Sequence, residues 1–222
     1  MPRYQQQQED ALNPEQRRIW DDCKAGPRGS VPPPVHVWLK SPGLADYAHR
    51  LGAHVRFGTP YTPKQTEIAI LVTARYWTAQ FEWAAHVRLG LQAGLTQEQI
   101  DAIAERRTPK FDDADDRLVY EFAHSYYQNH RVDDATYERV QKRWGDKGVV
   151  DLAGLIGYYS FVSVTLNVFE VPTPPGAKLL SDTRGDFAND IQRLSDLINN
   201  GGSDNQIFNA IVSCLNDLHN RT

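Results

Sequence analysis

The chain has 222 residues, of which 41% are hydrophobic and 23% are charged, and its formal net charge at pH 7 is −4. This composition is that of a soluble globular protein long enough to bury a sizeable core. The small negative charge gives no electrostatic basis for binding nucleic acid or an anionic membrane, so neither is expected as a partner.

The cysteine count limits the chemistry further. Cys23 and Cys214 are the only two cysteines, and they lie near opposite ends of the chain. This excludes a disulfide framework and a thiolate zinc site. The polar N-terminus has no apolar core of a signal peptide, and together these features predict a cytoplasmic protein.

Helix starts are marked by a capping residue that precedes a proline, or by a capping box. The pairs Asn13-Pro14, Ser41-Pro42 and Thr62-Pro63 each predict a helix, and Thr96 with Gln99 forms a further capping box. Gln16 and Gln65 complete the boxes that begin at Asn13 and Thr62. The Ser41 helix is predicted to run through the apolar residues Leu44, Tyr47, Ala48 and Leu51.

Between the first two of these helices lies the glycine- and proline-rich segment 26–34, GPRGSVPPP. It is predicted to be non-helical and to cross the surface or line a cleft as an extended loop. Arg28 is its one charge of note. It is either a solvated loop arginine or an anchor for a substrate carboxylate, for which a guanidinium is well suited.

The second half of the chain continues the helical pattern. Asp112 or Asp113 starts one helix and Asp133 or Asp134 another, and the apolar segment 149–169 is predicted to be a central buried helix. No segment alternates apolar and polar residues as a half-buried strand does, so the fold class is all-α. We expect a helical domain over residues 1–176.

A C-terminal helical hairpin is expected over residues 177–222. It is predicted from two amphipathic runs separated by Asn199-Asn200-Gly201-Gly202. Their apolar residues are Ile191, Leu194, Leu197 and Ile198, then Ile207, Ile211, Leu215 and Leu218.

Three residues between Thr62 and Gly94 could carry proton-transfer chemistry. Glu82 and His86 are one helical turn apart, so they can meet on one helix face. Glu67 precedes an apolar run, and a buried glutamate there must be paired or have a raised pKa. The alternative is a solvated Glu–His pair with Glu67 in an exposed first turn.

The run Phe81-Glu82-Trp83-Ala84-Ala85-His86-Val87, followed by Ala93-Gly94-Leu95-Thr96, resembles the carboxymuconolactone decarboxylase family. That family shares an all-helical fold with the alkylhydroperoxidase AhpD-like proteins. The likeness extends over residues 12–176 and includes the segments Gly26-Pro27-Arg28-Gly29, Trp38-Leu39-Lys40-Ser41-Pro42 and Gly157-Tyr158-Tyr159.

The peroxidase branch of that family has a glutamate, a CxxC pair and a histidine. Glu67 and His86 fall on the glutamate and the histidine, but Ala79 and Glu82 occupy the two cysteine positions. Peroxide reduction requires a thiolate with a resolving partner. The departure therefore argues against a thiol peroxidase.

The resemblance implies a decarboxylase that uses no cofactor and acts on a small β-keto or lactone carboxylic acid, whose own carbonyl takes up the electrons. His86 is the expected general acid/base, Glu82 its orienting partner and Glu67 a second carboxylate in the relay. The expected substrate-binding residues are Arg28, Tyr76, Trp83 and Tyr159, although aromatic residues at such positions are more often part of a core.

Three other readings stay open: an isomerase or dehydratase that uses the same relay, a peroxidase-type oxidoreductase, and a non-enzymatic assembly protein. No metal is expected, because the other histidines supply no matching third ligand. The family resemblance also implies a homo-oligomer, as a dimer, trimer or hexamer.

Overall fold

The computed structural model describes residues 3–181 and, beyond them, positions 195, 196, 198, 199, 201, 203, 206–208 and 211. The described residues form helices and loops with no strand among them, which confirms the all-α fold class. A short 3₁₀ helix, η1, is followed by eight α-helices: η1 (Glu9–Ala11), α1 (Pro14–Ala25), α2 (Pro33–Trp38), α3 (Pro42–Phe57), α4 (Pro63–Tyr76), α5 (Gln80–Gln92), α6 (Gln97–Ala104), α7 (Ala114–Asn129) and α8 (Asp134–Val168).

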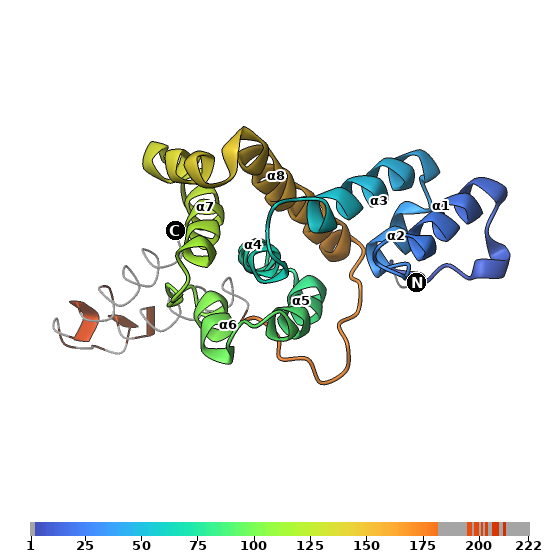
Figure 1. Cartoon of the computed structure of the whole chain (residues 1–222). Helices are drawn as coiled ribbons and strands as arrows, with labels where there is room; N and C mark the ends of the chain where they lie inside the picture. The colour runs from blue at the N-terminus through green and yellow to red at the C-terminus, as the bar shows by residue number, and fades with distance from the viewer. Residues whose placement is uncertain are drawn as a thin grey trace.

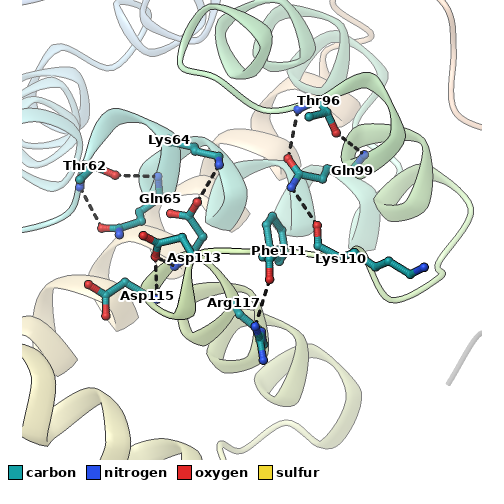
Figure 2. A network of polar contacts seen from close by, with 11 residues as sticks. Thr62, Lys64, Gln65, Thr96, Gln99, Lys110, Phe111, Asp113, Asp115 and Arg117 are labelled. Carbon is teal, nitrogen blue, oxygen red and sulfur yellow. Dashed lines mark hydrogen bonds and ion pairs between the residues drawn. The ribbon is translucent and has the colours of Figure 1, made fainter.

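The predicted helix starts are confirmed. Full capping boxes open α1, α4 and α6, with a glutamine side chain bonded back to the capping backbone in each. Figure 2 shows polar contacts around the starts of α4, α6 and α7, among them the hydrogen bond that Gln99 donates to the Lys110 carbonyl at 2.8 Å. Lys64 of α4 also forms an ion pair with Asp116 of α7 at 2.8 Å. The capping box of Thr62 and Gln65 fixes where α4 begins, and therefore the helical position of Glu67.

Helix α4 is the centre of the molecule. Every residue from Gln65 to Arg75 is buried, because neighbours cover the helix on all sides. It packs against α5, α6, α7 and α8, and Figure 1 shows it between α8 above and α5 and α6 below, with α1 to α3 on one side. The run from Ile68 to Val72 is apolar on all sides, as expected of a helix that neighbours surround.

Helix α3 begins at Pro42 as predicted, but its large apolar residues do not face the core. Leu44, Tyr47 and Leu51 are 47%, 79% and 49% exposed. The buried side instead carries the small residues Ala45, Ala48 and Gly52, together with Val55. Small side chains let α3 approach α8 closely, and this packing decides which side of the helix is buried.

The loop prediction for residues 26–34 is wrong at its C-terminal end. Pro33 and Pro34 are the first residues of α2, where a missing backbone N–H costs nothing. The preceding residues from Gly26 to Pro32 are non-helical, as predicted.

The central buried helix predicted over residues 149–169 forms the C-terminal part of α8. Gly145 has φ +71° and divides the helix into a shorter segment and a long apolar one. Among the described residues, α8 alone is long and apolar enough to cross a membrane, and 61% of its most apolar window is buried inside the protein. Such burial is typical of the core helix of a soluble protein. The predicted C-terminal hairpin falls mostly outside the described residues.

Candidate functional site

The site is built at the junction of α4 and α5. Helix α4 ends at Tyr76, Thr78 turns the chain with φ +47°, and α5 begins at Gln80. The Ala79 amide donates to the Ala74 carbonyl at 2.9 Å, which closes the turn. Because the turn is so short, α5 folds back along α4 and brings His86 beside Glu67.

His86 lies between two carboxylates. Its Nδ1 is 2.5 Å from Glu67 Oε2, and its Nε2 is 2.9 Å from Glu82 Oε1. All three residues are only 4% exposed, which excludes the alternative of a solvated pair. Burial works against protonation of His86, but the charges of Glu82 and Glu67 outweigh it and raise the pKa of His86 to about 9. His86 is therefore an imidazolium at neutral pH.

Arg56 on α3 completes this cluster, and no pattern in the sequence indicated it. Its Nη2 is 3.1 Å from Glu67 Oε1, so the two oxygens of Glu67 are divided between Arg56 and His86. The Arg56 side chain is 16% exposed. Burial disfavours its charge, but Tyr159, Glu67 and Glu82 raise its pKa. Two cations and two carboxylates thus balance in a buried cluster.

A cavity of about 430 Å³ opens beside the cluster. Glu82, His86 and Arg56 are part of its wall, whereas Glu67 is not. The rest of the wall combines the loop before α2 with aromatic residues and two further arginines, namely Pro27, Arg28, Ser30, Val31, Pro32, Pro33, Pro34, Trp38, Phe57, Phe81, Ala85, Arg88, Leu89, Tyr158, Tyr159 and Val162. Three arginines and one glutamate give the wall a net positive charge suited to an organic anion.

The structure separates the four expected substrate-binding residues into two groups. Arg28 and Tyr159 line the cavity that contains His86. Tyr76 and Trp83 do not, so their expected contact with substrate does not agree with where they lie. Tyr76 stacks on Tyr127 at 4.5 Å between ring centroids, and Trp83, which is 3% exposed, is turned toward α6.

The cavity wall holds no thiol. Cys23 is buried in a neighbouring pocket that also contains Arg28 and Tyr158. Burial raises the pKa of the Cys23 thiol to about 11, so it is protonated at neutral pH.

Within the part of the chain that the structure describes, one group of side chains outside the cluster has ligand atoms close enough for a metal ion. Asp22, Asp46 and His49 have such atoms within 4.8 Å of one another. Arg18 forms ion pairs with both aspartates and Arg50 with Asp46, so this group is already neutralised by cations.

The fold and the buried cluster define an all-helical protein with an acid–base centre that opens on a cationic cavity. Residues 42–114, which include Arg56, Glu67, Glu82 and His86, match the model of the Carboxymuconolactone decarboxylase family. The family resemblance stated from the sequence is thereby confirmed.

Solved structures support the same fold. A complex of the debrominase Bmp8, in a cysteine-to-alanine variant, with 2,3,4-tribromopyrrole has a TM-score of 0.60 at 15% identity, covering 79% of this chain and 92% of that one. The ligand-free Bmp8 structure has a TM-score of 0.58 at 15% identity, covering 76% and 90%. No protein among the curated ones matches the chain.

Proposed function

We propose that this protein is a cofactor-independent decarboxylase of small β-keto or lactone carboxylic acids. The observation that carries the proposal is the buried Glu67–His86–Glu82 cluster, whose imidazolium borders a cavity lined by arginines. A cavity lined by arginines and aromatic residues binds a carboxylate, and a protonated histidine in its wall supplies the acid that such a reaction requires.

The reaction proceeds in two steps. The bond between the carboxylate carbon and its neighbour breaks, its electron pair enters the conjugated carbonyl as an enolate, and CO₂ leaves. The enolate carbon then takes a proton from His86, and solvent returns that proton after product release. Glu82 and Glu67 hold the ring in position and favour its protonated form.

Arg28 is the proposed anchor for the substrate carboxylate. It reaches the cavity from the loop before α2, on the same wall as Tyr158 and Tyr159. Arg88 is exposed and borders the same cavity, so it adds to the field that attracts an anion.

Thiol chemistry is less well supported. Bmp8 is a debrominase, and the variant crystallised with tribromopyrrole lacks a cysteine. In this chain Glu82 occupies a cysteine position of the peroxidase pattern, and Cys23 is buried in a separate pocket. Among the described residues, dehalogenation or peroxide reduction through a thiolate at this cluster therefore has no nucleophile.

A proton-transfer reaction without loss of CO₂ is the second candidate. Two carboxylates around one imidazole can take up a proton at one carbon and return it at another, as an isomerase requires. A release assay separates the two functions, because decarboxylation alone produces CO₂.

The test is CO₂ release from a panel of β-keto and lactone carboxylic acids. We expect release by the wild type and a loss of at least about 100-fold in His86→Asn. The matched control is His130→Asn, at an exposed histidine outside the site. No release from any acid, with retained helical circular dichroism, would remove the decarboxylase proposal.

A further inference from the structure

Two hydrogen-bond donors in the cavity wall are buried without an acceptor among the described residues. They are the hydroxyl of Tyr159, whose residue is 2% exposed, and Nη2 of Arg28. Leaving a buried donor unpaired destabilises a protein. Such groups in a cavity wall are available to a ligand that supplies the missing acceptor.

Tyr159 is close to a second donor. The Arg56 guanidinium interacts with it both electrostatically and through a side-chain hydrogen bond, in which the phenol oxygen is the acceptor, and both side chains line the cavity. Burial raises the pKa of Tyr159 to about 12, against the opposing effect of Arg56 and Arg28, so its hydroxyl keeps its proton and can donate it in a hydrogen bond. A guanidinium has five N–H donors, and Glu67 accepts from only one nitrogen, Nη2, of Arg56.

These two donors lie next to the acid of the proposed reaction. The rings of Tyr159 and His86 meet edge to face, with centroids 5.3 Å apart. A ligand oxygen held by Tyr159 therefore places the neighbouring atoms of a small molecule against His86. Arg28 lies on the same wall but on the loop before α2, so it serves a different part of the ligand.

We infer that Tyr159 and Arg56 form an oxyanion-binding pair, which holds the carbonyl oxygen of the substrate while it becomes the enolate oxygen. This inference rests on the proposed function and assigns Arg56 a second role beyond its ion pair with Glu67. The negative charge that arrives from the breaking C–C bond is taken up at this oxygen, and donors already in place stabilise it without reorganisation.

The pair can be tested by binding, without turnover. The probes are 4-nitrophenolate, a planar oxyanion, and nitrobenzene, a neutral ring of similar shape. We expect the full-length wild type to bind the phenolate more tightly than nitrobenzene. Tyr159→Phe and Arg56→Lys should each lower phenolate affinity about 10-fold and leave nitrobenzene affinity unchanged, since one charge-assisted hydrogen bond is lost. Tyr137→Phe and Arg139→Lys are controls at exposed positions.

Equal binding of both probes by the wild type, or full phenolate affinity in Tyr159→Phe, would overturn the inference. Arg56→Lys keeps a cation beside Glu67, and Tyr159→Phe leaves the ion pair intact, so a folding defect in one variant does not remove the test. Selective phenolate binding without any CO₂ release would retain the oxyanion pair and refute the decarboxylase. If the wild type releases CO₂ and both variants release it at the same rate, the decarboxylase is retained and the oxyanion pair is refuted.

Discussion

Glu67 Oε2 lies 2.5 Å from Nδ1 of His86, although the two residues are 19 positions apart and lie on different helices. The remaining oxygen of Glu67 binds Arg56, and the remaining nitrogen of His86 contacts Glu82. Glu67 is therefore held from both sides, and His86 cannot rotate without breaking an ion pair. The cluster is preorganised in the protein alone.

The first prediction concerns pH. His86 has an ordinary pKa of 6.5 and a folded-state pKa raised to about 9, so folding stabilises its protonated form. Its contribution to the free energy of unfolding is complete below about pH 6.5 and is lost as pH rises through 9. We expect a loss of at most about 3 kcal/mol between these limits, measured by urea denaturation at several pH values.

His86→Asn provides the comparison for this experiment. The variant lacks the titrating ring, so its free energy of unfolding should change less over the same pH range. An identical slope in the two proteins would contradict a raised pKa for His86. Direct titration of the ring by ¹⁵N NMR should agree with the denaturation result.

The second prediction concerns Glu67→Gln. The amide keeps the shape of the side chain but removes a charge that raises the pKa of His86 and pairs with Arg56. We expect the pKa of His86 to fall toward neutrality and kcat to fall about 10-fold to 100-fold. The descending limb of the pH–rate profile should move to lower pH.

Glu138→Gln is the control, because Glu138 is exposed on α8. A variant at Glu67 that lowers the rate equally at every pH would show that the carboxylate acts only by supporting the structure. The shift of the profile is therefore the decisive measurement.

Much of this site is local in sequence and was predictable for that reason. The capping boxes at Thr62 and Thr96 join residues three apart, and Glu82 and His86 are one helical turn apart. The contact between Glu67 and His86 depends instead on the α4–α5 turn, and only the family resemblance predicts it. Helical spacing cannot predict this contact, because the two residues lie on different helices that pack together.

Arg56, Tyr76 and Trp83 show what packing adds. Arg56 precedes Glu67 by 11 residues on another helix, and no spacing rule joins the two. Tyr76 and Trp83 are as aromatic as Tyr159, but the side of a helix that faces the cavity depends on how α4, α5 and α8 rotate against each other. Small residues on α3 had a similar effect, because they determined which side of that helix was buried.

The third prediction concerns Gly52 on α3. A Cβ at this position would lie 2.1 Å from the Tyr158 hydroxyl and 2.8 Å from Nη2 of Arg28. Gly52→Ala must therefore displace two side chains of the cavity wall. We expect KM for the carboxylic acid to rise and the free energy of unfolding to fall by about 1–3 kcal/mol.

Gly157→Ala on α8 is the matched control. Nothing lies within 4 Å of a Cβ added there, and the residue is exposed within a helix. We expect this variant to be more stable than the wild type by about 0.5–1 kcal/mol with unchanged KM. Unchanged KM in Gly52→Ala as well would show that Arg28 and Tyr158 do not contribute to substrate binding.

The fourth prediction concerns assembly. The outer side of α8 carries a row of exposed apolar residues at helical spacing, Val150, Val164 and Val168. These three valines are 69%, 43% and 53% exposed, and the one charged residue between positions 150 and 168, Asp151, is buried. A row without charge is compatible with itself across a twofold axis. We propose that two copies of the chain associate through it.

Light scattering coupled to size-exclusion chromatography tests this proposal. We expect the wild type to have at least twice the 25.2 kDa mass of one chain. Val164→Lys should yield the monomer, because a lysine in the row would be buried without a partner in both copies. Leu91→Lys on α5 introduces the same charge at a residue that is 43% exposed outside the row, and should leave the mass unchanged.

A monomeric wild type refutes association. A wild type that binds lipid vesicles as a monomer, with binding lost in Val164→Lys, would assign the row to a membrane surface instead. An oligomer that both variants preserve would place the contact on another face.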